Sequence, residues 1–124
     1  MTVKKFSSIF DGLKEAYGTY RIEKTQSNGK NTGKAGIVRE PRNAGLWEGH
    51  LSGKGNSIGI IPINADNMCK WGCVDIDQYP LDHKLLLEKI RKLKLPLVVC
   101  RSKSGGAHCF LFCKDWVEAK DMQR

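Results

Sequence analysis

Two aspartates stand two positions apart in an apolar stretch of the chain. Asp75 and Asp77 alternate with Val74 and Ile76, and a β-strand places alternate side chains on one face. Both carboxylates would then lie side by side, with the two branched side chains in the core behind them. Paired carboxylates suit Mg²⁺ or Mn²⁺, which stabilise the charge that develops during phosphoryl transfer. Because an apolar strand rarely carries uncompensated charges, the pattern predicts a divalent metal site.

A second group of polar residues follows the aspartates. It combines basic and hydroxyl side chains with a glycine turn, and its candidate nucleotide-binding residues are Arg101, Lys103, Ser104, Gly105, Gly106 and His108. Backbone N–H groups in such a turn can bind phosphate oxygens, and the basic side chains add charge-assisted hydrogen bonds. A plain surface hairpin is the alternative. His108 has the strand parity of Phe110 and Phe112, so we expect it to face the cleft that Asp75 and Asp77 line.

A strand, a helix and another strand are expected to position these two groups. Residues 72–77 predict the first strand, and residues 82–94 carry apolar side chains on one face, as in an amphipathic helix. Residues 97–101 predict a buried strand parallel to the first, giving a right-handed β-α-β unit. Residues 107–113 would return as an antiparallel hairpin partner. The expected fold class is α+β, a mixed sheet with an RRM-like β-α-β core and a following hairpin.

The first half of the chain is expected to pack around this core. Apolar residues at helical spacing predict a helix over residues 5–17, packed against the sheet. Residues 24–42 combine glycines with basic side chains and predict a basic loop or a poorly ordered hairpin. Residues 57–63 predict a strand that ends near Pro62 and pairs antiparallel with residues 72–77.

The charge of the chain points to a polyanionic partner. Twenty-one Lys and Arg against thirteen Asp and Glu give a net charge of +8 and a pI near 9.4. The candidate contacts to a phosphate backbone are Lys24, Lys30, Lys34, Arg39 and Arg42. Solubility alone remains an alternative explanation for the charge. Trp47 and Trp71 could stack on bases, although packing at strand ends is the favoured interpretation.

The cysteines are expected to be reduced. Five cysteines are an odd number, which argues against a disulfide framework in a chain without an export signal. Two Cys-x-x-x-Cys pairs could supply a zinc site, and they consist of Cys69 with Cys73 and Cys109 with Cys113. Strand parity places these pairs on opposite faces of the sheet, so zinc is disfavoured. Buried thiols are the preferred interpretation of Cys100, Cys109 and Cys113.

The composition is that of one ordinary globular domain. The 124 residues are 40% hydrophobic and 27% charged, which argues against a disordered or fibrous chain. A chain of this length supports one core, so we expect a single domain over residues 1–124. No window approaches about eighteen uncharged apolar residues, and the N-terminus lacks the apolar run of a secretory signal. We therefore expect no membrane contact and an intracellular, cytoplasmic location.

The order of the motifs resembles the archaeo-eukaryotic primase superfamily, the primase-polymerases of archaea, eukaryotes, plasmids and viruses. The resemblance covers residues 46–113 and is greatest to the primase domains of phages and of TOTE conflict systems. It rests on these segments in order: His50-Leu51-Ser52-Gly53, Ile58-Gly59-Ile60-Ile61-Pro62, Cys69, Val74-Asp75-Ile76-Asp77 and Arg101-Ser102-Lys103-Ser104-Gly105-Gly106-Ala107-His108.

The resemblance implies roles for individual residues. Asp75 and Asp77 would bind the catalytic divalent metals. His108 would contact the phosphates of the incoming nucleotide, and Lys103 and Ser104 would flank that phosphate site.

The superfamily also has a third motif, an aspartate on a later strand that completes the metal site. The sequence departs from the pattern here, since Asp115 and Asp121 lie too close to His108 to replace that aspartate. We therefore expect the domain to be incomplete at its C-terminus, as a fragment or truncated product.

The resemblance implies a DNA primase or polymerase-type nucleotidyltransferase, encoded by a phage or mobile element. It would transfer nucleotides from (d)NTPs to a primer or initiating nucleotide on a single-stranded DNA template. Mg²⁺ or Mn²⁺ would be the cofactor, and a helicase is a further candidate partner. Two alternatives remain: a non-catalytic nucleic-acid or nucleotide-binding module derived from this fold, and a metal-dependent nuclease, whose chemistry uses similar residues.

Overall fold

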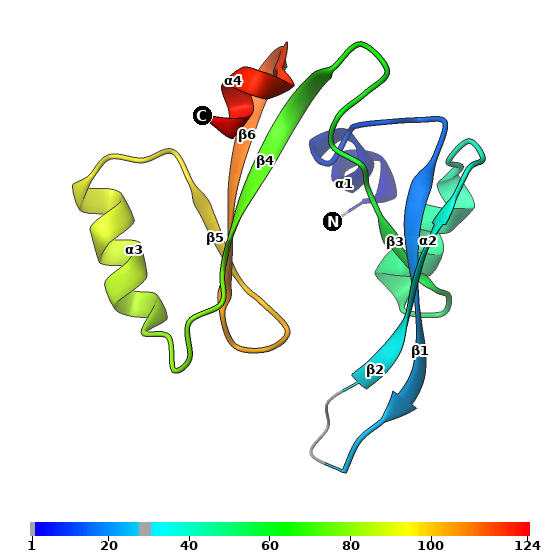
Figure 1. The fold of residues 1–124 in the computed structure, drawn as a ribbon, viewed down its shortest axis with the longest axis horizontal. Coiled ribbons are helices and arrows are strands. Elements are labelled where there is room, and N and C mark those ends of the chain that lie inside the picture. The colour runs from blue at the N-terminus through cyan, green and yellow to red at the C-terminus, as the bar shows by residue number, and fades with distance from the viewer. Residues whose placement is uncertain (1, 28–30) are drawn as a thin grey trace.

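The computed structural model describes residues 2–27 and 31–124, which form two three-stranded antiparallel sheets and four helices (Figure 1). The elements are α1 (Val3–Ile9), β1 (Tyr17–Thr25), β2 (Asn31–Val38), α2 (Ala44–Ser52), β3 (Ser57–Gly59), β4 (Met68–Ile76), α3 (His83–Lys92), β5 (Val98–Arg101), β6 (Ala107–Glu118) and α4 (Ala119–Gln123). This arrangement confirms the predicted α+β class. None of the helices in the described ranges is long and apolar enough to cross a bilayer.

The first sheet has the strand order β2-β1-β3. β1 and β2 pair antiparallel from Tyr17 opposite Val38 to Thr25 opposite Asn31, with a register irregularity between Ile22 and Lys24, so much of the basic segment is paired strand. The sequence-based prediction for the third strand was wrong in its length and in its partner. β3 ends at Gly59 and pairs with β1, whereas the sequence predicted a longer strand paired with residues 72–77.

The chain leaves β3 and crosses to the second sheet through residues 60–67. Asn64 Oδ1 accepts hydrogen bonds from the backbone N–H groups of Asp66 and Met68, both at 2.9 Å. This local turn sets the start of β4. β4 therefore begins in the second sheet, away from β3.

The second sheet has the order β4-β6-β5 and carries the predicted β-α-β unit. β4 and β5 are both antiparallel to β6, so they run parallel to each other with β6 inserted between them. The helix that joins them, α3, begins after Asp82, whose carboxylate accepts from the Leu85 N–H at 3.0 Å. Ile90 of α3 packs with Ala107 and Cys109 of β6 in the buried core of this half.

Helix α2 was not predicted from the sequence. Its segment contains two glycines, and its apolar residues do not gather on one face. Its ends are marked by local signals instead: the Asn43 side chain caps the first turn, and Gly53 ends the helix at φ +69°.

The predicted helix over residues 5–17 is wrong in its length. α1 ends at Ile9, and the chain then turns toward the crossing segment, where the Leu13 N–H donates to the Ile61 carbonyl at 2.9 Å. A Cβ at Gly12 would overlap that carbonyl oxygen, so glycine permits the close approach. Within α1, Phe6 packs edge to face on Trp47 of α2 at 5.7 Å, and the contact with the second sheet comes from the C-cap residue Phe10, whose ring lies 5.4 Å from Phe110.

We expect Gly12→Ala to lower the free energy of unfolding by about 2 kcal/mol, because the added methyl group must displace the Ile61 carbonyl. Gly36→Ala is the matched control, since its Cβ would lie 3.7 Å from Thr19 Cγ2, an ordinary contact. Urea unfolding followed by tryptophan fluorescence measures both variants. Equal stability of the two variants would contradict the role given to Gly12.

Candidate functional site

Asp75 and His108 face each other across neighbouring strands. They are register partners on β4 and β6, and His108 Nε2 lies 3.5 Å from Asp75 Oδ1. Residues directly opposite in an antiparallel pair share one face of the sheet. Their side chains are 57% and 43% exposed, so both groups can be reached from solvent. The structure therefore brings together a carboxylate and an imidazole that lie far apart in the sequence.

The glycine turn between β5 and β6 is fixed beside this pair. Its backbone is closed by hydrogen bonds from the Ser102 N–H to the Gly106 carbonyl at 3.0 Å and from the Gly105 N–H to the Ser102 carbonyl at 3.1 Å. Gly105 has φ +96°, a conformation that favours glycine. A Cβ at Gly106 would overlap the carbonyl oxygen of Ile76, so the turn packs against the end of the aspartate strand.

Asp77 is linked to the same turn through a tyrosine. The Tyr79 hydroxyl donates to Asp77 Oδ1 at 2.8 Å and lies 2.9 Å from Ser104 Oγ. Because the tyrosine proton is used by the carboxylate, the Ser104 hydroxyl donates to Tyr79. Asp77, Tyr79 and Ser104 thus form one polar chain along the edge of the site.

Sequence reasoning did not identify Tyr79 or His83 as site residues. His83 Nε2 lies 2.9 Å from the Gly106 carbonyl oxygen and connects the start of α3 to the glycine turn. The available signal was position: Tyr79 lies two residues after Asp77, and His83 follows the cap of α3. A tyrosine at position 79 or a histidine at position 83 does not by itself predict a contact with the glycine turn, because both contacts depend on the fold.

The two basic residues of the turn lie in different surroundings. Lys103 Nζ lies 5.8 Å from the centre of the Tyr20 ring, so the turn contacts β1 of the first sheet. Arg101 is exposed and is the register partner of Ala107, the neighbour of His108 on β6. Alternation along the strand places Arg101 on the opposite face from Asp75 and His108. Arg101 is therefore separated from the carboxylate–imidazole pair by the sheet, whereas Lys103 lies between the glycine turn and β1.

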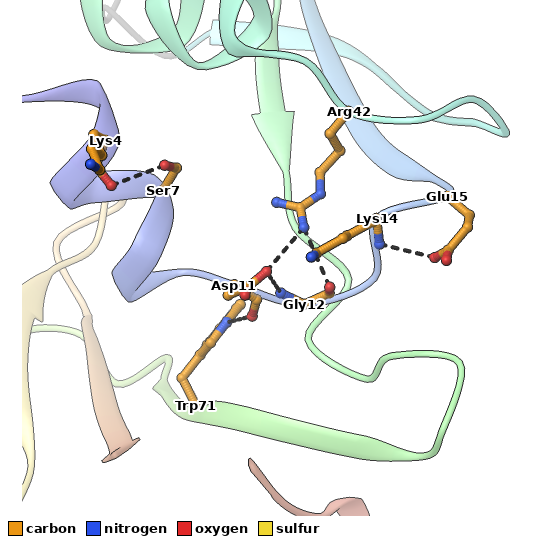
Figure 2. A network of polar contacts seen from close by, with 8 residues as sticks. All are labelled: Lys4, Ser7, Asp11, Gly12, Lys14, Glu15, Arg42 and Trp71. Atoms are coloured by element: carbon orange, nitrogen blue, oxygen red, sulfur yellow. Dashed lines mark hydrogen bonds and ion pairs between the residues drawn. The ribbon is translucent and has the colours of Figure 1, made fainter. Parts of the chain in front are cut away.

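The basic residues proposed for backbone contacts separate into two environments. Lys24, Lys34 and Arg39 are exposed on the β1–β2 hairpin and just after it. Arg42 is buried, with 9% of its side chain exposed, and its Nη2 pairs with Asp11 Oδ1 at 3.2 Å (Figure 2). Lys30 lies outside the described residues.

The tryptophans pack rather than present open faces to a base. Trp47 is 5% exposed and its ring meets Phe6 edge to face at 5.7 Å. The Trp71 indole N–H donates to the Asp11 carbonyl at 2.8 Å, and its ring packs on Phe10. Both rings pack as the sequence favoured, but not at strand ends, because Trp47 lies in α2 and Trp71 lies within β4.

The cysteines are divided between the two faces of the second sheet. Cys73 is opposite Phe110, and Cys100 is opposite His108, so both share the face of Asp75. Cys109 is buried on the other face. Cys100 is exposed, which corrects the expectation of a buried thiol: β5 is an edge strand of this sheet.

Desolvation and the negative charge of Asp75 both contribute to a raised pKa of the neighbouring Cys73 thiol. The pKa of Cys73 is raised, first by desolvation and then by the negative charge of Asp75. This places the charge of Asp75 close to Cys73 and keeps that thiol protonated at neutral pH.

Asp75 and Asp77 supply hard oxygen ligands of the type that Mg²⁺ and Mn²⁺ bind. Within residues 2–27 and 31–124, no cluster of three or more His, Cys, Asp and Glu side chains is arranged to hold a metal ion. Asp115 lies between Phe112 and Val117 of β6, where the register with β4 is irregular, and Asp121 lies in α4. The donor chemistry of the two carboxylates suits a divalent ion that takes its remaining ligands from water and from phosphate oxygens.

Comparison with known proteins gives one family. The family model described as the archaeo-eukaryotic primase domain of the TOTE conflict system matches residues 1–124. No curated protein matches the chain significantly. The match extends over the strands, the glycine turn and the hairpin described above. The chain therefore belongs to the archaeo-eukaryotic primase domains of TOTE conflict systems.

Proposed function

We propose that this domain is a metal-dependent nucleotidyltransferase that adds nucleotides from (d)NTPs to a primer or initiating nucleotide on a single-stranded DNA template. The observation that carries the proposal is the pairing of Asp75 with His108 across β4 and β6, beside a closed glycine turn. Family membership supports the same class of reaction. An exposed carboxylate and an exposed imidazole beside a glycine turn suit a nucleoside triphosphate.

Asp75 and Asp77 would hold Mg²⁺ or Mn²⁺. The ion, when bound, supplies positive charge against the triphosphate and the attacking hydroxyl. Tyr79 fixes the orientation of the Asp77 carboxylate through its 2.8 Å hydrogen bond, which leaves the other carboxylate oxygen for a ligand. Mg²⁺ usually keeps several waters and adds phosphate oxygens, so two carboxylates are sufficient for a nucleotide-dependent site.

His108 and the turn would bind the phosphates. The His108 imidazole is accessible, and its Nε2 lies 3.5 Å from Asp75 Oδ1. Ser102 and Ser104 place hydroxyl groups 3.5 Å apart at the turn, and Lys103 adds a positive charge. These groups bind and orient the triphosphate, so the chain contributes mainly by positioning.

The template strand would run along the basic hairpin. Lys24 and Lys34 are exposed on β1 and β2, and the Lys103–Tyr20 contact joins that sheet to the glycine turn. A strand of negative phosphates lying on the hairpin would therefore end near the nucleotide site.

Nucleotide binding is the first test of the proposal. We expect dATP with Mn²⁺ to bind the wild-type chain in calorimetric titration, and Asp77→Asn and His108→Ala to weaken this binding at least tenfold. Asp115→Asn is the matched control, because it removes an exposed carboxylate from the far end of the same sheet. Binding without metal, or equal binding by all four proteins, would argue against the site.

Strand extension separates polymerisation from hydrolysis. With Mn²⁺ and all dNTPs, we expect a labelled primer annealed to a template to lengthen, and Asp75→Asn to abolish the lengthening because one metal ligand is lost. Gel electrophoresis of the primer measures the result. Shortening of the primer that does not depend on dNTPs would favour the nuclease alternative, and nucleotide binding without either change would favour the non-catalytic module.

The hairpin can be tested through salt dependence. Each lost phosphate contact on single-stranded DNA lowers the slope of log K against log salt by about 0.7. We expect Lys24→Ala/Lys34→Ala to reduce both the affinity for an oligonucleotide and this slope, as measured by fluorescence anisotropy. Lys89→Ala/Lys92→Ala, on α3, is the control of equal charge, and an equal effect of the two double variants would show that only net charge matters.

A further inference from the structure

A second hollow lies apart from the Asp75–His108 pair. Its volume is about 850 Å³, and it is formed by α1, by the loop that follows α1 and by the start of α2. Its lining includes Lys4 and Ser7 of α1, Lys14 of the loop, and Arg42 and Asn43 before α2. None of its lining residues belongs to the glycine turn or to the aspartate strand.

The hollow has an excess of positive charge. Lys4, Lys14 and Arg42 line it, and Asp11 is the one carboxylate among its lining residues. The Asp11 carboxylate is already paired with Arg42 at 3.2 Å (Figure 2). The charges of Lys4 and Lys14 therefore remain without an acid in the wall of the hollow, giving a local excess of two positive charges.

Arg42 has a buried donor without an acceptor. Its Nη2 donates to Asp11 Oδ1 at 3.2 Å and to the Gly12 carbonyl at 3.3 Å. Its guanidinium carbon lies 5.9 Å from the centre of the Trp47 ring, so the group is held in place on a second side. Arg42 Nε is buried and has no hydrogen-bond partner in the part of the chain that the structure describes. Buried donors are nearly always satisfied in native proteins, so this atom points to an acceptor from outside the chain.

The start of α2 contributes to the same hollow. Asn43 and Ala44 lie in its wall, and α2 is a nine-residue helix whose first turn begins there. The N-terminus of a helix carries partial positive charge and free N–H groups, which favour an anion. The side chain of Asn43 accepts from the Leu46 N–H at 3.2 Å, so it leaves the first N–H groups of the helix to other partners.

We propose that this hollow binds a phosphate monoester. Two uncompensated lysines match the charge of about −1.5 to −2 that a phosphate monoester carries at neutral pH. The tetrahedral oxygens would accept hydrogen bonds from Arg42 and the start of α2, with Lys4 and Lys14 as charge partners. A small local shift of Arg42 would expose its Nε to the ligand. The volume exceeds that of one phosphate, so the group can belong to a larger ligand, such as the 5′ end of a nucleic acid strand.

The test uses inorganic phosphate and the full chain without divalent metal. Phosphate is titrated into ¹⁵N-labelled protein by NMR, and we expect saturable shifts of the Arg42 Nε–Hε signal and of the Ala44 and Gly45 amides. Lys4→Ala/Lys14→Ala should weaken the binding at least tenfold. Lys5→Ala is the matched control, because Lys5 is an exposed neighbour on α1 that does not line the hollow, and it should bind as the wild type does.

Two oligonucleotides of the same sequence, one with a 5′ phosphate and one with a 5′ hydroxyl, distinguish a strand end from a free phosphate as the ligand. Tighter binding of the phosphorylated strand, with the gain lost in Lys4→Ala/Lys14→Ala, would assign the hollow to a strand end. Saturable phosphate shifts without that gain would assign it to a free phosphate or a mononucleotide. Absence of saturable shifts, or equal loss in Lys5→Ala and in the double variant, would overturn the proposal.

This inference stands independently of the nucleotide site. Asp75→Asn should lose binding of dATP with Mn²⁺ but keep the phosphate shifts at Arg42 and Ala44. The double lysine variant should show the reverse pattern. The two proposals can therefore fail separately.

Discussion

The segment around Asp11 holds the two sheets of this domain together. The Trp71 indole of the second sheet donates to the Asp11 backbone carbonyl at 2.8 Å, and the Asp11 carboxylate pairs with the buried Arg42 ahead of α2. The next residue, Gly12, lies so close to Ile61 that a side chain has no room. Removing one partner of a buried charge pair leaves the other uncompensated, which makes such a junction sensitive to substitution. No strand of one described sheet pairs with a strand of the other, so side-chain contacts and this segment set their relative position.

The same junction influences what is exposed on the face that carries Asp75 and His108. Phe10, immediately before Asp11, packs edge to face on Phe110 and Phe112 of β6. His108 continues this row, with its ring 6.0 Å from Phe110, and is the member that reaches solvent beside Asp75. The aromatic contacts therefore bury one end of the strand face and leave the polar end open. A site of this kind is held by a packed strand rather than by a loop, which favours fixed geometry.

The basic side chains of this chain do not all lie on the surface. Some basic side chains are exposed on the hairpin, as expected for contacts to a phosphate backbone, whereas Arg42 is buried at the junction with one donor unsatisfied. The backbone of Arg42 is also held at the junction, since its N–H donates to the carbonyl of Lys14, in the loop after α1, at 3.0 Å. The net charge alone predicts a polyanionic partner, but burial and pairing decide which of these groups can touch it.

The sequence by itself determined the features that depend on local periodicity. Alternation along the strand predicted the face of Asp75, and helical spacing predicted α3. Only the tertiary structure decided that β3 pairs with β1, that α1 ends at Ile9, and that Tyr79 bridges to Ser104. The physical reason is range: side-chain periodicity and capping act over a few residues, whereas strand partners and cross-chain hydrogen bonds depend on contacts between segments far apart in the chain.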